Sequence, residues 1–154
     1  MKVVNYKTST ILGRLAICIG FVITGISLIL ASIFLEASFI RKFFSVIGGV
    51  LGIIVFGRLG LMVLILLFKD KEMFRYDQES IIVKNRKLNL NNIRKVEVEN
   101  EIPTGYLGIK TPAFILNTHD REKIFIHTYY CISKKDYPVI NRTLKDIVSD
   151  RTKR

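Results

Sequence analysis

Few residues of this chain have the side-chain chemistry that an enzyme or a metal site requires. His119 falls in a predicted turn and His127 in a predicted strand, and neither has an acidic cluster near it in the sequence. Cys131 stands far from Cys18, so neither a disulfide nor a metal-ligand spacing is expected. The sequence also lacks a phosphate-binding glycine loop and the HExxH and GxSxG motifs. We therefore predict no enzyme, no metal site and no cofactor; an enzyme would need a deep polar pocket around His127 or Cys131.

A group of basic residues without acidic neighbours offers the clearest candidate for binding. This group, called the basic segment below, consists of Lys84, Arg86, Lys87, Arg94 and Lys95. It extends from the end of one predicted strand to the start of another, soon after an apolar stretch ends at Phe68. Each such charge near an anionic membrane surface contributes about 1 kcal/mol to binding. We expect the basic segment to bind anionic lipid headgroups or a protein partner; the alternative is a solvated face that serves only solubility and topology.

Apolar and charged residues are segregated along the chain. Hydrophobic residues make up 49% and charged residues 24% of the 154 residues. The charges within residues 11–68 are Arg14, Glu36, Arg41, Lys42 and Arg58. Residues 69–154 hold 18 Lys and Arg against 12 Asp and Glu, a net charge of +6. This division predicts a membrane hairpin followed by one small soluble domain, whose positive charge suits a position beside anionic lipid.

Two apolar segments are long enough to cross a membrane, because about 20 helical residues cross a bilayer core. The predicted parts of the chain are a tail at 1–10, transmembrane helices at 11–35 and 43–68, a connecting loop at 36–42 and a soluble domain at 69–154. The alternative for the first segment is a cleaved signal peptide. Its length opposes that alternative, as does the lack of a small-residue cleavage pattern in ASIFLEA.

Basic residues near the hairpin predict its orientation. Two spans place both termini on one side of the membrane. Lys2 and Lys7 precede the first span, and many basic residues from Lys69 onward follow the second. Arg41 and Lys42 in the connection weaken this asymmetry without reversing it. Since cytoplasmic segments carry the excess of Lys and Arg, we expect a multi-pass protein of the cell inner (cytoplasmic) membrane with cytoplasmic N- and C-termini.

Small residues recur on both predicted spans, where they would allow helices to approach closely. They include Gly13, Gly20 and Ser27 in the first span and Gly48 and Gly52 in the second. Further small residues of the first span lie between them at steps of three and four. We expect these faces to pack on each other within the hairpin. The alternative is a dimerisation face, which would make the protein a homo-oligomer.

Arg58 is an isolated charge inside the second span. Counted from Phe43, it lies roughly five residues short of the cytoplasmic boundary, so its guanidinium can snorkel to lipid phosphate. The alternative is a buried functional charge, for which neither span has an acidic partner at that depth. Its helical phase separates it from Gly48 and Gly52, which suits lipid or another subunit better than the first helix.

The remainder of the chain predicts an α+β domain. From Met73 onward, short strand-like runs alternate with turn residues. The predicted strands are MFRYD, IIVK, KLNL, RKVEVE, YLGIK, AFILNT and KIFIHT, with Thr111-Pro112 as a break before AFILNT. An amphipathic helix follows, with Ser133 as N-cap, Asp136 at N3 and an apolar face of Ile140, Leu144, Ile147 and Val148. We expect six or seven antiparallel strands in a partial barrel, with this helix covering one open end.

The order of these elements resembles that of bacterial PH-like membrane proteins. In that group a strand, a turn ending in Gly or Ser followed by Ile, and a Leu-x-x-Ile-x-x-Val stretch open a PH-type barrel after a transmembrane hairpin. Here Ser80-Ile81 and Leu90, Ile93 and Val96 occupy those positions. The resemblance covers nearly the whole chain in layout. It implies a cytoplasmic PH-like antiparallel β-barrel held at the membrane, whose early strand-loop meets lipid headgroups, and it implies no catalytic mechanism.

Together these features predict a membrane-anchored binding module that recognises a protein partner or anionic lipid headgroups at the cytoplasmic leaflet. The alternative is a membrane self-protection protein that confers immunity to a toxin, which the hairpin layout alone suggests. Nucleic acid is not an expected partner, because aromatic residues are not interleaved with the basic ones.

Overall fold

The computed structural model describes the backbone of residues 1–36, 38–69 and 71–152 and the side chains as far as Ser149. Within the predicted loop and the predicted soluble domain, residues 37, 70, 153 and 154 lie outside this description. The chain forms two compact units. The helical unit comprises residues 11–69, and the sheet unit comprises residues 1–10 together with 70–154.

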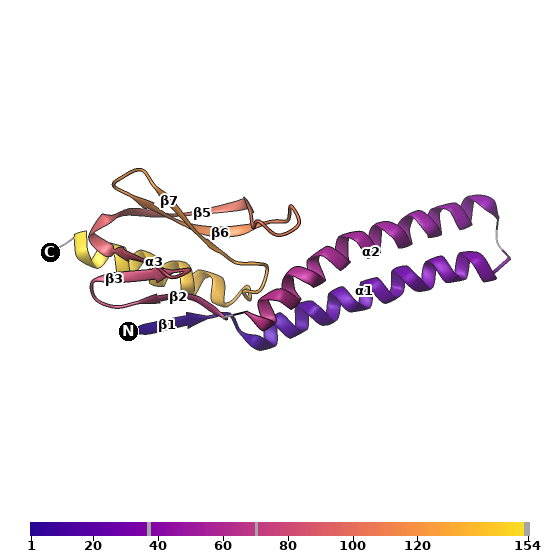
Figure 1. The fold of residues 1–154 in the computed structure, drawn as a ribbon, viewed down its shortest axis with the longest axis horizontal. Coiled ribbons are helices and arrows are strands. Elements are labelled where there is room, and N and C mark those ends of the chain that lie inside the picture. The colour runs from indigo at the N-terminus through magenta and orange to yellow at the C-terminus, as the bar shows by residue number, and fades with distance from the viewer. Residues whose placement is uncertain (37, 70, 153–154) are drawn as a thin grey trace. The chain divides into compact units, whose positions relative to one another are not determined.

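Two antiparallel helices make up the helical unit (Figure 1). α1 spans Thr8–Phe34 and α2 spans Phe39–Phe68. Both are long and apolar enough to cross a bilayer, with mean hydropathies of 2.5 and 2.7 over their most apolar 18 residues. Most of their side chains are exposed, unlike those of a core helix in a soluble protein. α2 begins earlier than expected, so Arg41 and Lys42 lie in its first turn rather than in the connecting loop.

The two helices approach each other most closely at a pair of glycines. A Cβ added to Gly25 would lie 2.8 Å from the carbonyl oxygen of Gly49, and a Cβ added to Gly49 would lie 2.6 Å from that of Gly25. Nearby, the rings of Phe21 and Phe56 stack with their centroids 4.0 Å apart. Since no side chain fits between the two glycines, the helices meet there through their backbones.

The glycines predicted to pack the hairpin do not lie at this contact. Four of them have open space where a Cβ would be added, with no atom of the other helix within 4 Å; these are Gly13, Gly20, Gly48 and Gly52. Ser27 is exposed. Instead, the buried residues of α1 recur every seven positions, at Ile11, Cys18, Gly25 and Ser32. This seven-residue repeat is the period of helices that pack along their length, and it includes large residues as well as small ones. The small residues alone therefore did not identify the faces that pack within the hairpin, and their alternative role in a dimerisation face stays a prediction.

The described residues of the sheet unit form seven strands in two antiparallel sheets and one long helix (Figure 1). The order in the four-stranded sheet is β1-β2-β3-β4, and in the three-stranded sheet it is β5-β6-β7. The elements are β1 (Lys2–Asn5), β2 (Glu72–Tyr76), β3 (Ser80–Val83), β4 (Arg86–Asn89), the 3₁₀ turn η1 (Leu90–Asn92), β5 (Ile93–Pro103), β6 (Lys110–Thr118), β7 (Lys123–His127) and α3 (Asp136–Thr152).

The N-terminal segment, expected to be a tail, forms a strand of the first sheet. β1 pairs with β2, with Val4 opposite Phe74, and the Tyr6 amide donates a 2.8 Å hydrogen bond to the Lys71 carbonyl. The buried Tyr6 hydroxyl donates a short hydrogen bond to the carbonyl oxygen of His127 at the end of β7. Residues 1–6 therefore join the residues that follow α2 to the second sheet.

One predicted strand is a loop. Residues 104–109, which include most of YLGIK, connect β5 to β6 and are closed by a 2.9 Å hydrogen bond from the Thr104 amide to the Ile109 carbonyl. Pro112, predicted as a break, lies inside β6, where the pairing with β5 is irregular between Glu99 and Ile102. An irregular register is where a strand tolerates proline, because the ladder hydrogen bond is already missing there.

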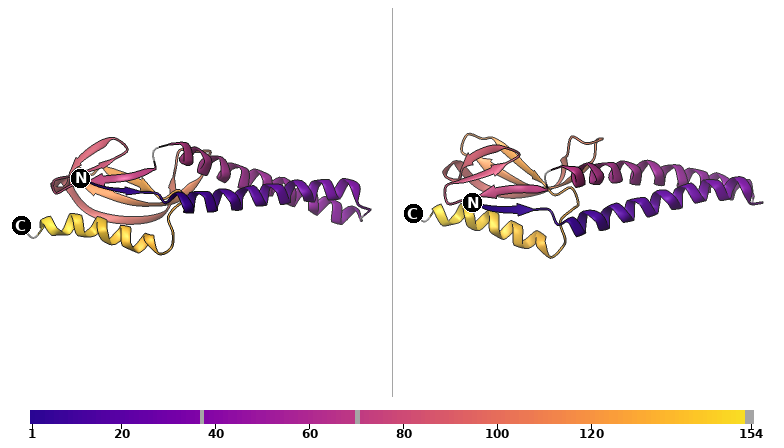
Figure 2. Two further views of the ribbon diagram at one scale, coloured as in Figure 1. Left: turned by 90° about the horizontal axis from the view of Figure 1, so that it is seen from below. Right: turned by 60° about the horizontal axis from the view of Figure 1, so that its bottom comes forward.

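The core of the sheet unit lies between its two sheets and α3. Its largest fully buried side chains include Phe74, Phe114, Ile81, Leu116, Ile126 and Leu144. α3 packs against β5 and η1 and runs alongside them (Figure 2). The predicted cap is confirmed: the Asp136 amide donates to Ser133 Oγ at 3.1 Å, and Ser133 Oγ donates to the Asp136 carboxylate at 2.7 Å.

The two sheets do not form a closed barrel, such as the PH-like resemblance implied. Each strand order has two ends, so β1 and β4 are edge strands of one sheet and β5 and β7 of the other. α3 covers part of the opening beside β5. The fold is thus a helical hairpin with an α+β unit of two open sheets and a C-terminal helix.

Gly49→Val should force the helices of the hairpin apart, because the added Cβ would overlap the carbonyl oxygen of Gly25. We expect disulfide cross-linking between Phe21→Cys and Phe56→Cys, in a chain without its native cysteines, to fall about tenfold. Gly48→Val is the matched control and should leave cross-linking unchanged. Equal losses from the two glycine variants would contradict the assigned contact.

Tyr6→Phe should lower the free energy of unfolding of the sheet unit by about 1–3 kcal/mol, because it leaves the buried His127 carbonyl without its donor. All six tyrosines lie in this unit and the chain has no Trp, so the tyrosine band of the near-ultraviolet circular dichroism spectrum, at wavelengths where Phe does not absorb, follows this unit alone in the micelle-bound protein. Tyr130→Phe removes a 3.0 Å bond to the Lys110 carbonyl from an exposed ring and should cost less. A larger loss in the Tyr130 variant would overturn the assignment.

Candidate functional site

The fold separates the basic segment into two groups on different sheets. Lys84 and Asn85, with φ of 48° and 65°, form the turn between β3 and β4. Two successive positive φ values are typical of the tightest hairpin turns. Arg86 and Lys87 follow on β4, and all three basic residues of this hairpin are exposed. The other two members, Arg94 and Lys95, lie at the start of β5 in the second sheet.

Acidic residues distant in sequence partly neutralise the basic segment. Arg86 forms a two-pronged ion pair with Glu122, which precedes β7, with Nη2 to Oε2 at 2.6 Å. Lys95 forms an ion pair with Glu97 on β5. These carboxylates oppose the attraction of the segment to an anionic surface. The basic segment is therefore not one continuous cationic patch.

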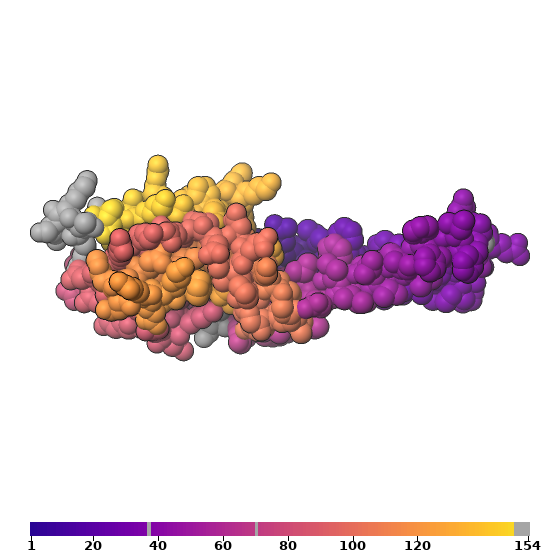
Figure 3. Space-filling model, turned by 90° about the horizontal axis from the view of Figure 1, so that it is seen from above, coloured from indigo at the N-terminus to yellow at the C-terminus, as the bar shows by residue number. Residues whose placement is uncertain are grey.

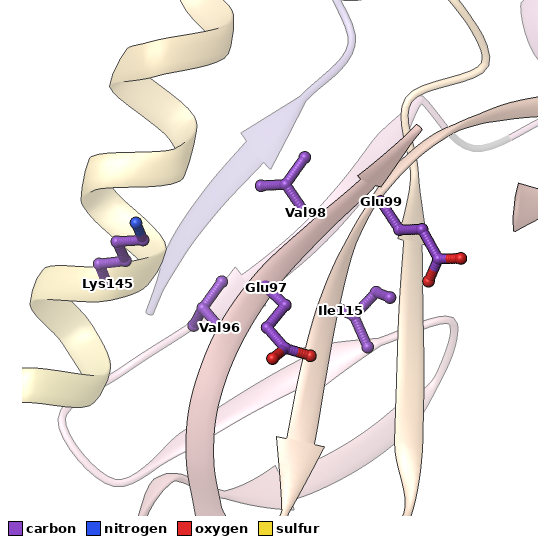
Figure 4. A pocket seen from close by; sticks show the side chains of 6 residues that line it. All are labelled: Val96, Glu97, Val98, Glu99, Ile115 and Lys145. Atoms are coloured by element: carbon purple, nitrogen blue, oxygen red, sulfur yellow. The ribbon is translucent and has the colours of Figure 1, made fainter. Parts of the chain in front are cut away.

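A groove of about 360 Å³ lies along β5 beside α3 (Figure 4). Its lining residues are Val96, Glu97, Val98 and Glu99 of β5, Ile115 of β6 and Lys145 of α3. In the space-filling view, the side chains of α3 and of the β5 sheet lie next to each other (Figure 3). This groove, called the β5 groove below, combines apolar, acidic and basic side chains from three elements.

Apolar and acidic side chains alternate along β5, so they line the groove from opposite faces of the strand. Val96 and Val98 pair with Leu116 and Phe114, so these four side chains share one face of the sheet. Val98 is nevertheless 39% exposed, because it lies at the open side of the sheet unit.

The acidic residues of the groove project from the opposite face of β5 (Figure 4). Hydrogen bonds from Lys95 and Asn117 hold the pKa of Glu97 below its ordinary value, so its carboxylate is charged at neutral pH. Lys145 approaches from α3 on the other side. The β5 groove therefore offers an apolar wall, two carboxylates and an opposing ammonium group.

The outer edge of β5 adds backbone hydrogen-bonding groups to this groove. β5 pairs with β6, and in the part of the chain that the structure describes no strand pairs with its other edge. An edge strand presents a row of amide and carbonyl groups that can pair with another extended chain. The β5 groove can thus bind backbone as well as side chains.

The sequence alone predicted one part of the β5 groove. The alternation from Arg94 to Glu99 predicted a strand with one buried face, and β5 confirms that strand. The position of β5 at a sheet edge depends on strand order, and the approach of Lys145 depends on how α3 packs. Neither has a local sequence pattern.

His127 and Cys131 lie in the interior of the sheet unit, 6% and 1% exposed, and do not line the β5 groove. Burial, with a smaller contribution from the positive charge of Lys84, lowers the pKa of His127 to about 4. Burial likewise raises the pKa of Tyr129, whose ring lies 5.5 Å from that of His127, to about 12. Both side chains are therefore neutral near pH 7, as the interior of a fold requires.

Arg58 belongs to the helical unit and lies on α2. It is exposed, and it is two residues from both Phe56 and Gly60, which face α1. At 100° per residue, two positions place Arg58 on the side of α2 away from α1. The prediction measured the phase of Arg58 from Gly48 and Gly52, which do not lie at the helix contact, and the role of Arg58 stays a prediction.

One family model matches the chain over residues 2–142, and its description is "Family of unknown function (DUF5381)". The match covers the residues of β1, α1, α2 and all the later strands, and it ends within α3. Comparison with curated proteins and with solved structures gave no match.

The free energy of unfolding of the sheet unit should fall as the pH is lowered from about 6.5 to about 4. In this range unfolded His127 takes up a proton, whereas folded His127, with a pKa of about 4, does not. His127→Phe should flatten this dependence in denaturant titrations at about pH 7, 5.5 and 4.5. His119→Phe, which changes an exposed turn residue, should leave the pH dependence unchanged. An unchanged slope in the His127 variant would show that other groups cause it.

Proposed function

The chain belongs to the DUF5381 family, whose function is unknown, and we propose that it is a membrane-anchored binding module. In this proposal α1 and α2 cross the cell inner membrane, and the sheet unit faces the cytoplasm. The ligand is an extended segment of a protein partner that lies along the β5 edge, in the β5 groove. The observation that carries the proposal is an edge strand bordered by a groove that contains apolar and charged side chains.

The pairing of β1 with β2 supports two membrane crossings. The residues before α1 and after α2 lie in one sheet, joined by the bond from the Tyr6 amide to the Lys71 carbonyl. Both ends of the hairpin must then be on the same side of the membrane. Removal of α1 as a signal peptide would also remove β1, which the first sheet contains. The excess of basic residues at these ends favours the cytoplasmic side.

An extended peptide fits the β5 groove by a known mode of recognition. A chain added to a sheet edge gains affinity from backbone hydrogen bonds and specificity from alternate side chains. Val96 and Val98 would contact apolar side chains of the partner, and Glu99 would attract basic ones. Glu97 would contribute less, because it already forms an ion pair with Lys95. Such a partner segment would therefore alternate apolar and basic residues. Lys145 would exclude segments with a basic residue on the α3 side.

The ion pairs favour a protein partner over the basic segment as a lipid site. Arg86 and Lys95 already bind Glu122 and Glu97, so their charges contribute less to a lipid surface than unpaired charges would. Two sheets followed by a C-terminal helix remain consistent with the PH-like resemblance. We propose that the sheet unit is an open form of that barrel, in which the opening beside β5 is the binding site.

The proposal can be tested with a photoreactive phenylalanine analogue at position 98, introduced into the full-length protein in its native membrane. We expect a protein adduct at position 98 and none at Val139, an exposed residue of α3 outside the β5 groove. Adducts to lipid alone at position 98 would contradict a protein ligand.

A peptide covering the cross-linked segment should then bind the full-length protein in nanodiscs. We expect Glu97→Lys and Glu99→Lys together to weaken it about tenfold, because they reverse the charge of the groove. The matched control, Glu79→Lys, changes an acidic residue of the β2–β3 turn and should leave affinity unchanged. Equal affinity in all three proteins would place the peptide elsewhere.

A further inference from the structure

The loop between β5 and β6 presents an apolar side chain at its tip. Leu107 is 49% exposed and has a φ of 49°, a backbone conformation that leucine seldom adopts. It lies between Gly105 and Gly108, which have φ of 78° and 69°. A strained, exposed leucine costs stability in a water-facing loop, so such a position suggests a function.

Internal hydrogen bonds hold this loop in one shape. Thr104 Oγ1 donates to the Ile109 carbonyl at 2.8 Å and accepts from the Tyr106 amide at 3.2 Å. The Ile109 amide donates to the Tyr106 carbonyl at 2.9 Å. Leu107 is thus presented by a rigid loop, and its exposure does not result from an unstructured segment.

Aromatic contacts place the loop at the end of the sheet unit where the chain enters α1. The Tyr106 ring lies 6.0 Å from that of Tyr129, which in turn lies 6.0 Å from that of Tyr6. α1 begins two residues after Tyr6, at Thr8. Tyr130, also at this end, is 44% exposed and donates its hydroxyl to the Lys110 carbonyl.

We propose that this loop inserts Leu107 into the headgroup region of the membrane that α1 and α2 cross. The proposal rests on the membrane anchoring of the helices and is independent of the peptide ligand. The hydrocarbon boundary near Ile11 lies about 5 Å of helix after Thr8, where α1 begins, which is comparable to the thickness of the headgroup layer. Tyrosine rings prefer that layer, and Leu107 would reach the acyl chains below it.

Charge at this end of the sheet unit suits the same surface. Lys71 lies next to Thr8, to which its Nζ donates at 3.3 Å, and exposed Lys110 begins β6. The register of β2 with β3 also brings the β3–β4 turn, with Lys84, to the level of the first residues of β2. Leu107, half-buried Tyr106, exposed Tyr130 and these lysines at one end of the sheet unit have the composition of an interfacial anchor.

The test uses an environment-sensitive dye on a single cysteine in the otherwise cysteine-free full-length protein, in nanodiscs of phosphatidylcholine with and without phosphatidylglycerol. At Leu107→Cys we expect a lipid-borne nitroxide at shallow depth to quench at least about threefold more than at Val139→Cys, and aqueous iodide to quench less. A larger effect with phosphatidylglycerol would show that the lysines contribute. Iodide quenching equal to that at Val139 would overturn the proposal, as would protection from both quenchers, which would mean that protein covers the loop.

A second labelling site tests whether the dye itself causes the insertion. With the dye at Tyr130→Cys, the change Leu107→Asp should lower quenching by lipid nitroxide severalfold, whereas Val98→Asp in the β5 groove should not. No effect of Leu107→Asp would overturn the role of this leucine. A dye at Leu30→Cys in α1 reports anchoring itself: quenching there by a deep nitroxide, with none at position 107, would refute the loop insertion and leave the membrane hairpin intact.

Discussion

Pairing between β1 and β2 is the constraint on which the rest of the architecture depends. β1 precedes α1 and β2 follows α2, so the hydrogen bonds between these strands join the two ends of an antiparallel hairpin. The Tyr6 hydroxyl extends this connection to His127 in the second sheet. A sheet unit assembled from both ends of the hairpin has two covalent connections to it, where a domain that follows a hairpin has one.

The opening beside β5 follows from the same construction. Seven strands divided four and three leave edges on both sheets, and α3 covers part of the gap with Leu144 in the core and Lys145 at the rim. Edge strands are usually shielded, because their exposed backbone invites pairing with other chains. Here Glu97 and Glu99 add charge to the edge, which discourages unselective pairing while leaving a basic, extended segment acceptable.

Local patterns explain which features could be read from the sequence. The two long apolar segments predicted both helices, and the strand at 94–99 and the Ser133 cap are set by neighbouring residues. β1 escaped prediction because four residues before an apolar segment carry too little periodicity, and their partner lies about 70 residues away. The open sheets and the Gly25–Gly49 contact depend on tertiary packing, as does the neutralisation of Arg86 by Glu122.

The early position of β1 has a consequence for synthesis. β1 leaves the ribosome before α1, yet its partner β2 emerges only after both helices have been made. The four-stranded sheet therefore cannot form until the hairpin is complete, and the core residue Phe74 has no β1 neighbour until then. Closing so long a loop would ordinarily slow folding, but antiparallel helices return the chain to its starting side and bring the two strands together. Formation of the hairpin is thus the step that lets the four-stranded sheet assemble.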